Sequence, residues 1–174
     1  MKNTLRALVF HVIVIAFVFL LGLVLNWSGF IRELVYSNLF FKILLSFLPI
    51  MFYYNLGKGM SKRTPKKLDY FTGSLIFLIA IALGLVAFLG LGREIFSTSV
   101  ASSMWRFPLD IFLMPQMYIY EVLKIKHNII TFIIAAIMPG IIFGVSIKSS
   151  RKKIEKQKRI RKMQERRKQR AQNY

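Results

Sequence analysis

Few residues of this chain have the side chains and the spacing that chemistry requires. Its two histidines, His11 and His127, have no histidine, aspartate or glutamate partners at the spacing of a metal site. The chain has no cysteine, which excludes disulfide bonds, thiolate metal ligands and a cysteine nucleophile. Neither a Gly-x-Ser-x-Gly motif nor a glycine-rich phosphate loop occurs. We therefore predict no catalytic residues, no metal site, no cofactor and no enzymatic activity.

Asp110 and Glu121 are the nearest approach to a catalytic pair of carboxylates. They are eleven residues apart, which would place both on one face of a straight helix. Pro115 lies between them and interrupts such a helix, whereas acid–base catalysis requires two carboxyl groups at a fixed separation. Catalysis by this pair is therefore not expected.

Two ionisable residues lie within long apolar segments and form a candidate intramembrane polar site. They are His11 in the first segment and Lys42 in the second. An ionisable group inside a membrane is a functional candidate by default. Alternatives stay open for both. His11 can bond a neighbouring helix as a neutral ring or extend to the inner surface, and Lys42 can extend to the outer surface or pair with Glu33, Asp110 or Glu121.

Basic residues give the strongest functional signal. The chain has 26 lysines and arginines against 7 aspartates and glutamates, a net charge of +19, which predicts an anionic partner. Such clusters next to a membrane span bind anionic lipid headgroups or an acidic protein. Nucleic acid of the ribosome is a weaker alternative, because the tail has no aromatic residue before Tyr174 for base stacking. The residues predicted to bind are Lys58, Lys62, Arg63, Lys66, Lys67, Arg151, Lys152, Lys153, Lys156, Lys158, Arg159, Arg161 and Lys162.

Four apolar segments determine the fold class. Each has about the 20 residues that cross a bilayer as a helix, and none alternates as a membrane β-strand would. The first run, of 19 residues, is too long for a signal peptide and is interpreted as an uncleaved span. The sequence therefore predicts an all-α membrane protein with a transmembrane domain over 1–147 and spans at 7–25, 34–57, 70–92 and 128–147.

The distribution of charge predicts the orientation of these spans. Nearly all the net positive charge falls on the amino end, the loop at 58–69 and the tail, which lie on one side of the membrane if there are four spans. Positive loops mark the cytoplasmic side, so we expect a multi-pass protein of a bacterial cell membrane with both termini in the cytoplasm. Tryptophans and tyrosines near the span ends, Tyr53 among them, fit an interfacial belt.

The segment 105–124 allows several placements. It contains two acidic residues and two prolines, which disfavours a fifth span, and a fifth span would also place the basic tail outside. We expect an outer segment that lies in the membrane interface or folds onto the bundle. A re-entrant segment stays open, because Pro108 and Pro115 interrupt helices.

Small residues predict where the helices pack closely. Ala136, Gly140 and Gly144 recur every four residues in the fourth span, and Ala80 and Gly84 have the same spacing in the third. Such faces let two helix backbones approach each other. We expect the third span, through Ala80 and Gly84, or a partner protein to occupy this face of the fourth.

The tail at 148–174 contains neither glycine nor proline and is predicted to continue the fourth span as one basic cytoplasmic helix. These features fit a membrane accessory or scaffold subunit that packs against a larger membrane assembly. The alternative is a small transporter or lipid-handling protein that uses the intramembrane polar residues. A transporter would show internal repeats with matching broken helices, and no sequence repeat is visible.

Overall fold

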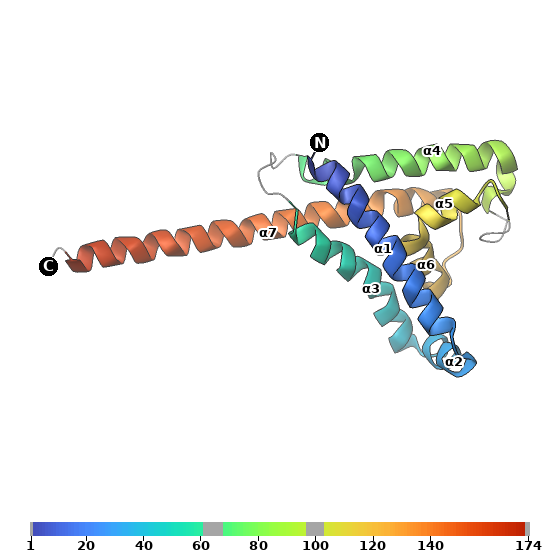
Figure 1. Cartoon of the computed structure of the whole chain (residues 1–174), viewed down its shortest axis with the longest axis horizontal. Coiled ribbons are helices and arrows are strands. Elements are labelled where there is room, and N and C mark those ends of the chain that lie inside the picture. The colour runs from blue at the N-terminus through green and yellow to red at the C-terminus, as the bar shows by residue number, and fades with distance from the viewer. Residues whose placement is uncertain (1, 61–67, 97–102, 173–174) are drawn as a thin grey trace.

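The chain is predominantly helical in the part that the computed structural model describes, which comprises residues 2–60, 68–96 and 103–172. No strand occurs among these residues. In chain order the elements are α1 (Lys2–Asn26), α2 (Gly29–Ser37), α3 (Leu39–Lys58), η2 (Tyr70–Gly73), α4 (Ser74–Leu91), η3 (Gly92–Phe96), α5 (Phe107–Phe112), α6 (Met114–Leu123) and α7 (Ile129–Gln172) (Figure 1).

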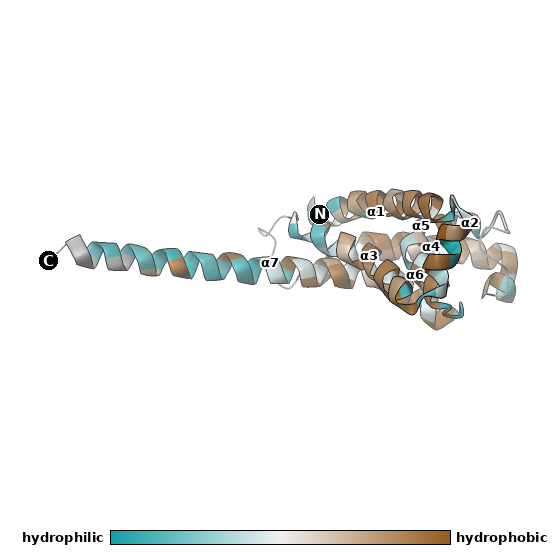
Figure 2. Cartoon of the chain, turned by 90° about the horizontal axis from the view of Figure 1, so that it is seen from below, coloured by the Kyte–Doolittle hydropathy of each residue, from teal (hydrophilic) through white to brown (hydrophobic). Residues whose placement is uncertain are grey.

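In the described part of the chain, four helices are long and apolar enough to cross a membrane, and this part of the sequence prediction is confirmed. Their apolar side chains also cover the outside of the bundle, where Leu78 is 61% and Ile130 is 64% exposed. A helix that is apolar on all sides is suited to a membrane interior. Figure 2 shows the apolar colouring over the bundle and polar colouring over the far part of α7. The four stretches are Asn3–Asn26, Leu39–Lys58, Tyr70–Leu91 and Ile129–Glu165.

The second span begins at Leu39 rather than at residue 34. Asn38 interrupts the apolar run, because its φ of −88° and ψ of 124° are extended rather than helical. Its side chain accepts a hydrogen bond of 2.9 Å from the Phe40 N–H and so caps α3. Residues 34–37 therefore belong to the short helix α2.

The four long helices form two pairs that diverge from each other. α1 packs against α3, and η2 and α4 pack along α7. The two pairs meet where α3 packs against α7, which is the most extensive contact between elements in the described part of the chain. Figure 1 shows α1 and α3 running away from α4 and α7 toward α2, with α5 and α6 in the space between the pairs. One core cluster includes Val14, Tyr53 and Phe143 and holds α1 to α3 and α7. A second cluster includes Ala80 and Ala136 and holds α4 to α7.

The helices α5 and α6 pack inside the bundle. Leu113 and Gln116 have no exposed area, and Val122 is 2% exposed. α5 packs against α4, and α6 packs against α1 and α3. The two short helices are separated at Leu113, just before Pro115, which has no N–H to continue the hydrogen-bond ladder. Of the placements that the sequence left open, the structure shows the segment folded into the bundle.

The tail continues α7 without a break as far as Gln172. Every side chain from Lys152 to Glu165 is exposed, so no described element packs against this stretch. Figure 1 shows it extending away from the bundle as a single straight helix. We call the part from Lys152 to Gln172 the rod.

Candidate functional site

Three buried polar side chains from three different helices form a hydrogen-bonded chain at the centre of the bundle. His11 on α1 and Gln116 on α6 have no exposed area, and Tyr53 on α3 is 1% exposed. His11 Nδ1 lies 2.5 Å from the Tyr53 hydroxyl, and Gln116 Nε2 lies 3.3 Å from the same hydroxyl. His11 Nε2 lies 2.9 Å from the carbonyl oxygen of Phe112. We call His11, Tyr53 and Gln116, with this carbonyl, the polar chain.

The partners of His11 determine where its proton sits. The Phe112 carbonyl can only accept, so Nε2 carries the hydrogen and donates it. Nδ1 of the neutral ring is then an acceptor and takes the hydrogen of the Tyr53 hydroxyl. The same hydroxyl oxygen accepts from the Gln116 amide. All hydrogen bonds of the polar chain thus run in one direction, from Gln116 through Tyr53 and His11 to Phe112.

The Phe112 carbonyl is available because the helix breaks between α5 and α6. In a continuous helix this carbonyl would accept from the N–H of Gln116. Here the N–H groups of Gln116 and Met117 both donate to Leu113, at 3.0 and 2.9 Å. The break thus releases a main-chain acceptor inside the bundle, and His11 satisfies it.

Aromatic rings enclose the polar chain. The Phe112 ring meets the His11 ring edge to face with centroids 4.6 Å apart, and Phe143 meets Tyr53 in the same way at 5.4 Å. Hydrogen bonds are stronger in such apolar surroundings than in water. Gln116 Oε1, in contrast, is a buried acceptor that has no partner among the described residues. The arrangement can orient one neutral imidazole and leaves one acceptor available.

Lys42 is not part of the polar chain. It is partly buried, and no ion pair among the described residues joins it to Glu33, Asp110 or Glu121. The pairing alternative for Lys42 is therefore not seen in the structure.

Asp110 and Glu121 are held apart by different partners. Buried Asp110 accepts a 3.0 Å hydrogen bond from Arg106 Nε, and Arg106 also donates to the carbonyl of Ile95 at 2.8 Å. Glu121 is exposed and lies 3.2 Å from His127 Nε2. The two carboxylates thus have different partners and different exposure.

α6 is further held by Tyr120. Its hydroxyl donates a 2.9 Å hydrogen bond to the carbonyl of Thr131 at the start of α7. Burial raises the pKa of Tyr120 above its usual value, because the ionised form is poorly solvated there. The phenol therefore stays protonated at physiological pH and keeps this link between α6 and α7.

The basic residues gather at one end of the bundle, which we call the basic end. It comprises the start of α1, the end of α3, η2 and the turns of α7 around Arg151 (Figure 1). Arg151 makes two hydrogen bonds to Asp69, Nε to Oδ2 at 2.9 Å and Nη2 to Oδ1 at 2.8 Å. Lys58 donates to Asn55 Oδ1 at 2.9 Å and lies over the Tyr54 ring. The paired geometry of Arg151 and Asp69 fixes α7 to η2.

The other predicted binding residues divide into two groups. Lys62, Arg63, Lys66 and Lys67 lie outside the described residues. The second group stands exposed on the rod: Lys152, Lys153, Lys156, Lys158, Arg159, Arg161 and Lys162.

The glycines of the small-residue face of α7 meet the start of the third span and not Gly84. Gly140 faces Gly73 of η2, so close that a Cβ on Gly73 would lie 2.3 Å from Gly140 Cα. Gly144 lies beneath the ring of Tyr70. Gly84 faces the ring of Phe132 instead of Gly140. Ala80 and Ala136 belong to the same core cluster.

Sequence reasoning identified His11 but missed its partners. Tyr53 was placed in an interfacial belt because it lies near the end of a span, whereas its ring faces the interior. Gln116 carried no signal in a segment without clear periodicity. Gly73 was visible only as one glycine near the start of a span. Asp69 is the only acid of the basic loop at 58–69, which was the one available hint of its ion pair.

Comparisons of the chain with protein-family models, with curated proteins and with solved structures found no match.

Proposed function

We propose that the protein is a small accessory or scaffold subunit of a bacterial cell membrane, with both termini in the cytoplasm. It packs against a larger membrane assembly and presents a basic helix to a partner. The observation that carries this proposal is α7, a single helix that includes both a candidate span and the rod. The partner-binding element is therefore attached rigidly to the membrane domain and not through a linker.

The rod extends beyond the reach of the lipid surface. From Lys152 to Gln172 it has 21 residues, or about 30 Å at the rise of an α-helix. Electrostatic attraction to headgroups falls off within a Debye length of about 8 Å. The first turns therefore contact anionic lipid, and the far turns are presented to an acidic surface of a protein partner.

The experiment compares two variants of the rod in the full chain. One replaces Lys156, Lys158, Arg159, Arg161 and Lys162 by Gln, and the control replaces the three lysines of this set by Arg and so keeps the charge. The tagged proteins are extracted gently from membranes, and the proteins that purify with them are identified. We expect one stoichiometric membrane partner with an acidic cytoplasmic surface, retained by the control and lost by the neutralised variant.

Other outcomes contradict the proposal. A protein that purifies alone, or a neutralised variant that retains the same partner, removes the role of the rod. If nuclease treatment releases the partner, the rod binds nucleic acid, which contradicts the proposal of a protein scaffold.

A second candidate function is a small transporter, and the polar chain favours it. A helix break that exposes a carbonyl to a buried ionisable ring is typical of transport sites. The test is a solute-uptake or proton-flux assay with the purified chain in vesicles. Flux that His11→Leu abolishes supports transport, and flux equal to that of empty vesicles contradicts it.

A further inference from the structure

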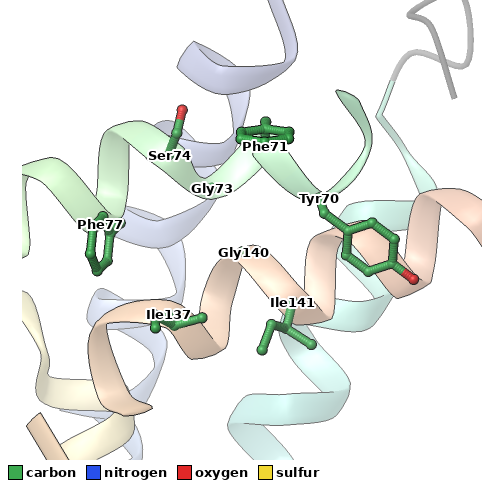
Figure 3. A pocket seen from close by; sticks show the side chains of 8 residues that line it. All are labelled: Tyr70, Phe71, Gly73, Ser74, Phe77, Ile137, Gly140 and Ile141. Carbon is green, nitrogen blue, oxygen red and sulfur yellow. The ribbon is translucent and has the colours of Figure 1, made fainter. Parts of the chain in front are cut away.

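A groove runs along the outer side of the contact between η2–α4 and α7. Its floor is the crossing of Gly73 and Gly140, where the backbones of η2 and α7 approach each other closely. The rings of Phe77 and Tyr70 stand on either side of the crossing, and Ile141 borders it from α7 (Figure 3). The groove has a volume of about 360 Å³ and a predominantly apolar lining.

A basic cavity of about 240 Å³ adjoins this groove, and Tyr70 lines both. Two lysines of α7, Lys148 and Lys152, line the basic cavity together with the ion pair of Arg151 and Asp69. The Lys148 ammonium lies 6.0 Å from the centroid of the Tyr70 ring. Glu155 is the remaining charged residue at its rim.

The lysines supply the charge that an anion would meet. Asp69 already takes two hydrogen bonds from Arg151, so its charge is largely offset. In the part of the chain that the structure describes, no carboxylate forms an ion pair with Lys148 or Lys152. Both ammonium groups therefore remain available to a phosphate.

The distance between the apolar groove and the basic cavity corresponds to the distance between the acyl chain and the phosphate of a phospholipid. Lys148 follows Ile141 by seven residues, which is about 10 Å along the helix. An apolar groove at the level of a span and two ammonium groups about two turns nearer the rod match an acyl chain and its phosphate. The groove opens to the outside of the bundle, where lipid would lie.

We propose that this composite groove binds one anionic phospholipid. Its acyl chain lies on the Gly73–Gly140 crossing between Phe77 and Tyr70, and its phosphate is bound by Lys148 and Lys152. The site rests on the membrane placement that the proposed function assumes, but it does not depend on the partner of the rod. It differs from the general attraction of a basic tail for membranes because it requires a particular apolar surface.

The test measures lipid retention by the full chain in detergent with native mass spectrometry. Delipidated protein is titrated with phosphatidylglycerol, with phosphatidylcholine as the neutral lipid and inorganic phosphate as a competitor. We expect one tight phosphatidylglycerol, at least tenfold weaker phosphatidylcholine binding and no displacement by millimolar phosphate. Replacing Lys148 and Lys152 by Gln should weaken binding about thirtyfold, from about 1 kcal/mol per lysine.

Two matched controls make the result specific. Lys124→Gln with Lys126→Gln removes the same charge from exposed positions between α6 and α7 and should leave the tight site unchanged. Ile141→Trp fills the groove and should abolish tight binding, whereas Ile130→Trp, at an exposed position on the same helix, should not. Equal losses in both lysine pairs, or full binding by Ile141→Trp, would overturn the proposal. Partner capture by the rod is scored separately, so the two proposals can fail independently.

Discussion

A single imidazole ring, that of His11, connects three helices of the bundle. It accepts from Tyr53 on α3 and donates to the carbonyl of Phe112 at the end of α5. Both ring nitrogens are satisfied, so burying this ring in an apolar interior does not leave an unpaired polar group. The position of α5 relative to α1 thus depends on one side chain.

Tyr53→Phe tests this connection. The change removes the donor to His11 Nδ1 and the acceptor of the Gln116 amide, leaving two buried groups without partners. We expect the free energy of unfolding to fall by about 1–3 kcal/mol, measured by denaturation with SDS in mixed micelles. Tyr54→Phe is the matched control, since its hydroxyl makes an exposed hydrogen bond of 3.1 Å to Ser149. Equal losses in the two variants would show that the polar chain contributes no special stability.

At the scale of elements, η2 and α7 cross with their backbones in close approach. A Cβ on Gly73 would lie 2.3 Å from Gly140 Cα, but a Cβ on Gly140 would lie 3.5 Å from Gly73 Cα. The first distance requires one backbone to move and the second is an ordinary contact. The two glycines face each other, but an added Cβ is therefore tolerated at Gly140 and not at Gly73.

Gly73→Ala and Gly140→Ala are expected to have unequal effects. The first should lower the free energy of unfolding by about 1–3 kcal/mol through overpacking, or prevent folding. The second should change it by less than about 1 kcal/mol, because alanine also favours the helix. Thermal unfolding in detergent measures both, with Gly22→Ala, which meets nothing within 4 Å, as the control. Similar losses at Gly73 and Gly140 would contradict this account of the crossing.

Much of the arrangement of elements was predictable from hydropathy and charge, but not its interruptions. The long apolar helices follow from runs of apolar residues, and the continuation of α7 follows from a tail without glycine or proline. Pro49 and Pro139 lie inside α3 and α7 without ending either helix. The break at Asn38 depends on one capping side chain, which an average over twenty residues does not detect. Pro115 indicated the break at Leu113. The burial of α5 and α6 could not be predicted in the same way, because it depends on how the two helix pairs diverge in the tertiary structure.

Of the candidate site, the sequence predicted His11 but not the residues that contact it. His11 is conspicuous because it is the only polar residue in its apolar run. Its partners come from segments 42 and about 100 residues away, and no local pattern marks them. Gly73 acquires its role only because α7 crosses at that position.

At the scale of the whole molecule, the basic end determines the expected orientation. Because positive segments stay in the cytoplasm, Gln164→Cys should be protected from an impermeant thiol reagent in intact cells and labelled after permeabilisation. Ser37→Cys, at the end of α2, should be labelled in intact cells. The chain has no native cysteine, so the background is clean. The reverse labelling pattern would show that the protein faces the other way.

The continuity of α7 makes the molecule a mechanical lever. Arg151, bonded to Asp69, is a fulcrum, and the 21 residues from there to Gln172 form an arm of about 32 Å. A tilt of about 10° at the fulcrum moves the tip by roughly 5 Å, from the same helical rise. A load on the tip is transmitted in the opposite direction, as torque on the Gly73–Gly140 crossing, where the two backbones leave little slack. A partner bound at the far end of the rod would thereby be coupled to helix packing in the bundle.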